Sequence, residues 1–220
     1  EKIDLSNVQG LKYHINTWGL SSNNWFADNL VPKMKRLNTI DFSDTVNYQH
    51  RSDMCMGIKA ILAACGELPI QTLIFSNNDL EHDGARAFSE YMSTTKTLKN
   101  LVCTGCHLGD KSAKMMLEAA KNQNLKLEKL IFDQNDLGKQ GILDLGAFLK
   151  KMSSTIQVVN IGSCLEVEST GLQGFLKALK TAPNLISLNI ENNKGINKAM
   201  SELQAIINMK PSSLRTLNIS

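Results

Sequence analysis

The sequence predicts an α/β solenoid, in which one strand and one helix alternate in coil after coil. Three observations lead to this fold class. Leucine-rich segments return at a fixed interval along the 220 residues. Within each segment apolar and polar residues alternate, as in a half-buried strand. Each segment is followed by apolar residues at helical spacing. Stacked coils of this kind share one continuous core, so we expect a single domain over residues 1–220.

The interval is regular enough to define a repeat. The pattern L-x-x-L-x-L-x-x-N/C-x-L is matched from Ile70 to Leu80 and from Leu127 to Leu137. Counting from Ile70, copies open at positions 70, 98, 127, 156, 185 and 214, so the intervals are 28, 29, 29, 29 and 29 residues. An earlier copy opens at Leu37. This pattern is that of leucine-rich repeats, and a length with room for a full helix is typical of the ribonuclease-inhibitor type.

Each copy begins with a short strand whose alternate side chains point inward. We expect Leu73 and Phe75 to stack on Leu101 and Cys103 of the next coil. The ninth position holds Asn78 in this copy, and a buried amide there requires hydrogen-bond partners in the backbone of the loop. Cysteine replaces asparagine at this position in two other copies, because it is small and bonds weakly.

The second half of each copy is predicted to be a helix. Apolar residues recur at helical spacing over 87–92 and over 113–120. Helices are wider than strands, so we expect them on a convex outer face, with parallel strands on the concave face. Weaker copies are expected near Ile3–Leu5 and Tyr13–Ile15. The chain stops at Ser220 in mid-repeat, so we expect it to be a fragment.

One interval is longer than the others. From Leu37 to Ile70 there are 33 residues, about four more than the period. The excess falls in Asp44–Asp53, which we expect to form a loop at the rim where the strands end, with Arg51 in it. Insertions at such rims commonly carry the function of a solenoid.

Composition excludes several classes of function. The 24 basic and 21 acidic residues give a net charge of +3, with no basic run, so we expect neither nucleic acid nor a membrane as a partner. The chain opens without the pattern of a signal peptide and holds no apolar stretch of membrane-spanning length, so we expect neither a secreted nor a membrane-spanning protein. Its five scattered cysteines indicate reduced thiols and a cytoplasmic protein.

Candidate chemistry within the chain is sparse. Cys103 and Cys106 form a C-x-x-C pair, but both occupy repeat positions that require small buried residues, so we interpret them as core. The histidines are scattered, and no nucleophile, base and orienting group occur together in a known motif. We therefore expect no metal site, no cofactor and no small-molecule active site.

Polar residues at the ends of the strands are the better candidates. They would lie along the concave face and the rim, where a partner protein can reach them. The candidate partner-binding residues are Asp44, Asn77, Asn78, Thr104, Asp133, Gln134, Glu191 and Asn192.

Several landmarks occur in the order typical of one family. Phe42-Ser43-Asp44 is followed by the long loop, by Arg51 and by a helix through Leu62. The next copy has the turn Ser76-Asn77-Asn78-Asp79-Leu80, and a later one has Gln134-Asn135-Asp136-Leu137-Gly138. In these features the chain resembles the Ran GTPase-activating proteins. Gly105 and Asp53 depart from the family, which has an asparagine and a lysine at the corresponding places.

The resemblance implies a function. A protein of this family binds a Ran-like small GTPase in the GTP form and orders the catalytic glutamine of the GTPase against the attacking water, without chemistry of its own. Arg51 is then the candidate catalytic residue, with a role in docking or loop anchoring in place of an arginine finger. The resemblance also implies a monomer in the cytoplasm or at the nuclear envelope that serves nucleocytoplasmic transport.

A second reading needs no GTPase. Repeats of this type also form interaction scaffolds, among them cytosolic sensors and actin regulators, and the fold does not distinguish these from an activator. A scaffold would change the rate of no GTPase.

Overall fold

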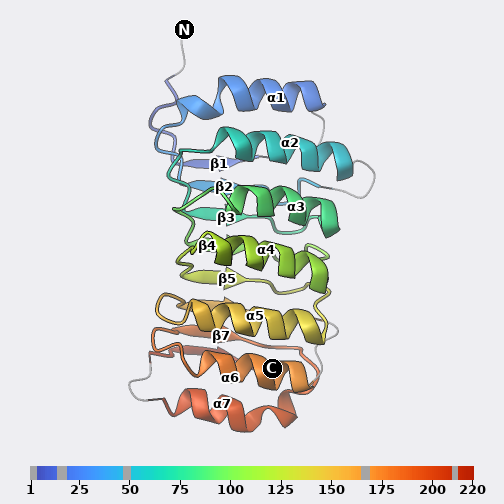
Figure 1. The fold of residues 1–220 in the computed structure, drawn as a ribbon, viewed down its shortest axis with the longest axis vertical. Helices are drawn as coiled ribbons and strands as arrows, with labels where there is room; N and C mark the ends of the chain where they lie inside the picture. Colours follow the sequence, from blue (N-terminus) through green and yellow to red (C-terminus); the bar gives the residue numbers. More distant parts are fainter. Residues whose placement is uncertain (1–3, 14–18, 47–50, 165–168, 210–212) are drawn as a thin grey trace.

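The computed structural model describes residues 4–13, 19–46, 51–164, 169–209 and 213–220. Within these residues, eight strands form one parallel sheet in the order β1 to β8. The helices stack as a single layer on one side of this sheet, each between two strands that are consecutive in the chain (Figure 1). The predicted α/β solenoid is confirmed.

The strands are each three residues long, while the helices have 8 to 14 residues. The strands are β1 (Gly10–Lys12), β2 (Thr39–Asp41), β3 (Thr72–Ile74), β4 (Asn100–Val102), β5 (Lys129–Ile131), β6 (Val158–Asn160), β7 (Ser187–Asn189) and β8 (Thr216–Asn218). The helices are α1 (Leu20–Asn29), α2 (Arg51–Ala64), α3 (Glu81–Met92), α4 (Asp110–Asn122), α5 (Lys139–Lys151), α6 (Ser169–Leu179) and α7 (Met200–Ile207). Short 3-10 turns, η1 (Val31–Lys33) and η3 (Ile196–Lys198), complete the described elements.

The strands stack in register, so equivalent repeat positions lie side by side. Leu73 pairs with Leu101 and Leu101 pairs with Leu130, and all three side chains are buried against the helices. The residues before and after each of them are half-buried on the other face of the sheet. Phe75 stacks on Phe42 of the preceding coil, with ring centroids 5.8 Å apart. The predicted stacking of Leu73 on Leu101 is confirmed, and Phe75 and Cys103 are both buried.

The asparagine at the ninth position joins neighbouring coils. Asn78 is buried, and its Nδ2 donates to the carbonyl oxygens of Phe42, at 2.9 Å, and Phe75, at 2.7 Å. Its Oδ1 accepts hydrogen bonds from the backbone N–H groups of Thr45, at 2.7 Å, and Val46, at 2.6 Å. One amide thus satisfies peptide groups of its own coil and of the coil before it, as predicted.

Other residue types at the ninth position make part of the same set of bonds. The Cys106 thiol donates to the Phe75 carbonyl at 2.8 Å, and the Cys164 thiol donates to the Phe132 carbonyl at 3.4 Å. The Thr45 hydroxyl donates to a carbonyl of the preceding coil at 2.7 Å. Each bond spans two coils, so this position links the coils whichever small polar residue occupies it.

Two expected boundaries were wrong. The first strand is Gly10–Lys12, and its pairing with β2 places Val8, 29 residues before Leu37, at the opening of the first copy. It therefore precedes the expected position near Tyr13, while Ile15 lies outside the described residues. Helix α2 begins at Arg51, so this residue starts a helix and does not lie within the inserted loop. Residues 47–50 of that loop lie outside the description.

Replacing Asn135 by alanine is expected to destabilise the fold strongly. Its Nδ2 bonds the Cys103 carbonyl at 2.5 Å, and its Oδ1 accepts from the N–H groups of Cys106 and Leu108 at 3.0 and 3.1 Å. Removing the amide leaves these buried groups unsatisfied, at a cost of about 3 kcal/mol. Urea denaturation measures the loss. Lys150→Ala, at an exposed helix position, is the control, and an equal effect of both substitutions contradicts the assigned role.

Candidate functional site

A row of residues with left-handed backbone follows the strands. We call it the rim row; it consists of Asp44, Asn77, Gly105, Gln134, Ser163 and Asn192, with φ between 52° and 60°. The N–H of each member bonds a carbonyl oxygen of the next coil, at 2.8 to 3.0 Å, so the row extends the ladder of the sheet. An identical turn in successive coils places these side chains at equivalent points along one edge of the solenoid.

Most of the predicted site residues lie at this edge. Asp44, Asn77, Gln134 and Asn192 are exposed members of the rim row. Thr104, Asp133 and Glu191 stand one residue before the row and are half-buried. The structure brings Asn77, Thr104, Asp133 and Gln134 together on three adjacent coils, where the Thr104 hydroxyl donates to the Asp133 carboxylate at 2.7 Å.

Asn78 does not belong to this surface. Its side chain is 2% exposed, and both of its polar atoms bond backbone groups of the loops. The expectation that Asn78 contacts a partner is corrected: Asn77 points outward because of its positive φ, while the next residue points into the core.

Arg51 is held within the chain. Its Nε donates to the Asp79 carboxylate at 3.2 Å, its Nη2 also bonds Asp79, and its Nη1 donates to Glu81 at 2.7 Å. The side chain is 19% exposed. The hydrogen bond to Asp79 is the largest contribution that raises the pKa of Arg51, so the guanidinium remains charged. Arg51 thereby braces the start of α2 against the loop between β3 and α3.

Glu191 is likewise bonded within the chain. Its two carboxylate oxygens accept from the side-chain amides of Asn189, at 2.9 Å, and Asn218, at 2.6 Å. These hydrogen bonds, that of Asn189 first, lower the pKa of Glu191. Glu191 joins β7 to β8, so its carboxylate is preorganised by the two neighbouring strands.

The cysteines have the surroundings of core residues. All five are buried, and Cys103 and Cys106 fill the interior of one coil as expected. Burial raises the pKa of the Cys106 thiol to about 12, and it raises that of Cys103 as well. Within the described part of the chain, no group of three or more potential ligands could hold a metal ion, and no helix is long and apolar enough to cross a bilayer.

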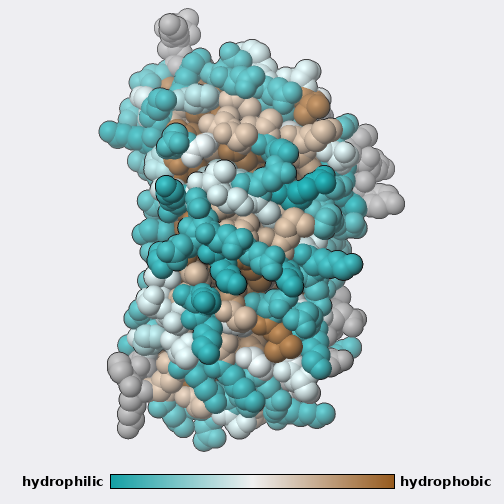
Figure 2. Space-filling view, in the orientation of Figure 1, coloured by the Kyte–Doolittle hydropathy of each residue, from teal (hydrophilic) through white to brown (hydrophobic). Residues whose placement is uncertain are grey.

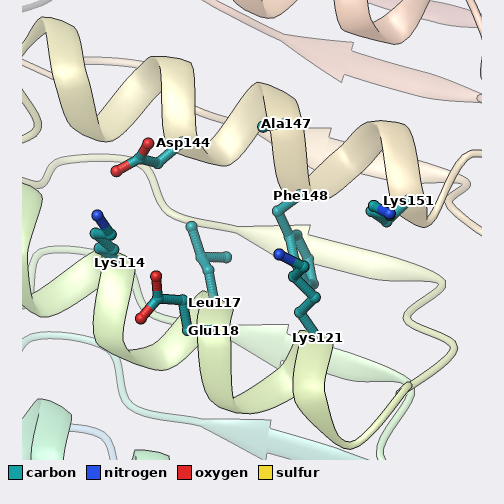
Figure 3. A pocket seen from close by; sticks show the side chains of 8 residues that line it. All are labelled: Lys114, Leu117, Glu118, Lys121, Asp144, Ala147, Phe148 and Lys151. Atoms are coloured by element: carbon teal, nitrogen blue, oxygen red, sulfur yellow. The ribbon is translucent and has the colours of Figure 1, made fainter.

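On the face covered by helices, grooves run between neighbouring helices of the described chain. Figure 2 shows this face, on which hydrophilic residues predominate and apolar surface appears in separate patches. A groove of about 170 Å³ lies between α4 and α5, with acidic and basic side chains around an apolar floor. Its lining consists of Lys114, Leu117, Glu118, Lys121, Asp144, Ala147, Phe148 and Lys151 (Figure 3). The groove follows the packing seam between these two helices.

Three apolar residues on the open face of the sheet were not among the predicted site residues. Ile74, Val102 and Ile131 pair in register on β3, β4 and β5 and are half-buried. The signal was present in the repeat, because all three occupy the variable position between the two buried strand residues, which carries Asp41 on β2 and Asn160 on β6. We call these three residues the central strip.

Comparison with known proteins gives three informative similarities. The Rho GTPase-activating protein gacW of Dictyostelium discoideum is 25% identical over 187 residues, which cover 82% of this chain and 16% of that protein. The ribonuclease inhibitor of Sus scrofa is 25% identical over 152 residues, 56% of this chain and 33% of the inhibitor. A crystal structure of a TLR13–ssRNA13 complex superposes with a TM-score of 0.50 at 14% identity and covers 98% of this chain and 33% of that one. No family model matches.

The similarity to ribonuclease inhibitor agrees with the repeat and with the parallel sheet. The chain therefore has the fold of a leucine-rich-repeat solenoid of the ribonuclease-inhibitor type. It spans a third or less of the length of these curated relatives, 16% of one and 33% of the other. The comparisons agree with the leucine-rich-repeat fold, and an activity specific to Ran is not among their findings.

The thiols of this leucine-rich-repeat protein are expected to resist modification while it is folded. Burial raises the pKa of Cys55, Cys65 and Cys164 to about 12, so these groups remain protonated at about pH 8, where thiolates react. Ellman's reagent should therefore label none of the five cysteines before unfolding and all five in guanidinium chloride. Rapid labelling of any native thiol contradicts the assignment of all five to the core.

Glu191 is expected to stabilise the fold in a pH-dependent way. Its pKa is lowered in the folded state, so its contribution is present above the unfolded value of about 4.3 and is lost as the pH falls through the folded pKa. The difference in unfolding free energy between wild type and Glu191→Gln should therefore shrink between about pH 6 and about pH 3. Urea denaturation across this range measures it, and a difference that does not vary with pH contradicts the coupling.

Proposed function

We propose that this leucine-rich-repeat protein binds a partner protein along the rim and the open face of its sheet, and that a Ran-like small GTPase in the GTP form is the partner to test first. The observation that carries the proposal is the rim row. Its six residues share one backbone conformation, and five of them carry a side chain at equivalent points of successive coils, while the sixth is Gly105. A rigid row of this kind fixes the spacing of polar contacts before binding, which lowers the entropy cost of association.

Three features support a GTPase as the partner. The order of landmarks from Phe42 to Gly138 is similar to that of Ran GTPase-activating proteins. The interval from Leu37 to Ile70 is about four residues longer than the others, and an arginine, Arg51, stands where the inserted stretch meets α2. A relative that aligns over 82% of this chain has a name that describes GTPase activation, although the alignment covers only 16% of that relative.

The contacts within the chain suggest how the work would be divided. Asp44, Asn77, Thr104, Asp133 and Gln134 would dock the GTPase, with Glu191 and Asn192 further along the solenoid. Arg51 would act as a brace, because its ion pairs with Asp79 and Glu81 hold the loop between β3 and α3, which also contains the rim residue Asn77. The GTPase would supply its own catalytic glutamine, and docking would lower the barrier by restricting the geometry of that glutamine and the attacking water.

A scaffold without effect on hydrolysis is the second candidate. Two observations favour it. The guanidinium of Arg51 is bonded to carboxylates of its own chain, and Gly105 offers no side chain where the activator family has an asparagine. Such a scaffold would bind its partner through the same rim but would leave nucleotide hydrolysis unchanged.

GTP hydrolysis by purified Ran, with catalytic amounts of this chain, distinguishes the two candidates. An activator is expected to raise the rate at least about tenfold with multiple turnovers. Asn77→Gly and Gln134→Gly remove two rim side chains while glycine keeps the left-handed backbone, so both should reduce stimulation without unfolding the chain. Lys150→Ala, on the helix-covered face, is the control and should stimulate like wild type.

The two negative outcomes have different meanings. Saturable binding of GTP-loaded Ran without stimulation would leave the scaffold as the function. If neither binding nor stimulation is found with Ran, and none with a panel of Rho-type GTPases, the GTPase proposal fails and the scaffold needs another partner. Arg51→Ala tests the brace: loss of stimulation together with a lower unfolding free energy supports it, while wild-type behaviour in both assays contradicts it.

A further inference from the structure

The central strip is an apolar run within a row of the open face that is otherwise polar. Along this row of the sheet, the positions before it carry Lys12 and Asp41, and those after it carry Asn160 and Asn189. Only β3, β4 and β5 carry branched apolar side chains in the row. Half-buried apolar side chains that adjoin across three strands form a surface that a partner can desolvate.

A gap in the rim row lies in the same three coils. Every other member of the row carries a side chain on the same left-handed backbone, so this conformation does not require the glycine at position 105. What the glycine provides is space. A Cβ added there would lie 3.4 Å from Asn77 Oδ1 and 4.0 Å from Gln134 Oε1, so two amide side chains from neighbouring coils flank the gap.

The charges near the gap favour a cation. Asp133 stands one residue before the rim row in the next coil, and one of its carboxylate oxygens accepts the Thr104 hydroxyl at 2.7 Å. The backbone carbonyl of Asp133 accepts the N–H of Gly105 at 3.0 Å, which places this coil directly beside the gap. Lys129 lies on β5, at the other side of the strip from the rim. A bound segment would therefore direct its positive charge toward Gly105 and away from Lys129.

We propose that the central strip and the gap at Gly105 form one docking site for a partner segment with apolar side chains followed by a lysine or arginine. The apolar side chains cover Ile74, Val102 and Ile131, and the cationic group enters the gap between Asn77 and Gln134 near Asp133. This inference rests on the proposed protein-binding function and specifies the chemistry of the partner that the central coils select.

Selection from a random peptide library displayed on phage tests the site with the intact chain. Peptides selected on wild type are expected to combine apolar residues with lysine or arginine. Val102→Lys places a charge on the strip, and Gly105→Asn fills the gap with a residue that tolerates the left-handed backbone. Each should weaken binding of the selected peptides at least tenfold in fluorescence anisotropy.

Matched controls separate the site from general effects. Ser187→Lys adds the same charge to the open face on β7, and Ser163→Asn adds the same side chain to the rim row outside the central coils. Both should bind the selected peptides like wild type. Equal unfolding midpoints in urea verify that Gly105→Asn and Ser163→Asn fold alike.

The proposal is overturned if the library yields no binders, if the selected peptides are acidic, or if all four variants bind them equally. Binding that is equal in all variants would still leave protein recognition elsewhere on the chain intact, so it would refute the site without refuting the proposed function. A failure of the GTPase assay, in turn, would not change the peptide result.

Discussion

The fold depends on the hydrogen bonds that buried peptide groups make in the loop between each strand and the helix that follows it. Asn78 and Asn135 bond carbonyl and N–H groups in two coils at once, and Asn193 donates to the Ile161 carbonyl of the coil before it at 2.8 Å. A coil without its neighbour would leave these groups unpaired in an apolar interior. The coils are therefore stable only as an array, and the rim row owes its constant geometry to the residue that follows it in each coil.

Because the helices run parallel to one another, their dipoles point in the same direction. All helix N-termini lie toward the rim, where Glu81, Asp83 and Asp110 occupy first turns. The last turns of α4 and α5 carry Lys121 and Lys151. Each of these charges complements the dipole of its helix, so the acidic residues at this edge are compatible with stability. An edge of this kind suits partners with cationic groups, while the constant backbone lets single side chains determine specificity.

Much of the fold could be predicted because the repeat fixes both period and burial. The stacking of Leu73 on Leu101 and the inward asparagines followed from spacing alone. The first strand was misplaced because Val8 stands where the pattern has leucine. The start of α2 was placed too late, since Arg51 lies in a polar stretch where helical spacing gives no signal before Met54.

For the candidate site, the sequence by itself determined which residues fall at the ends of the strands, because the period assigns each residue a place in its coil. The tertiary structure decided which of them face outward. Asn77 and Asn78 are adjacent and identical, yet the left-handed φ of the first turns it to solvent while the second bonds the core. The partners of Arg51 and the two amides beside Gly105 come from other coils. Such contacts depend on how the coils stack in three dimensions. The spacing of the repeat along the sequence does not show which side chains of neighbouring coils meet.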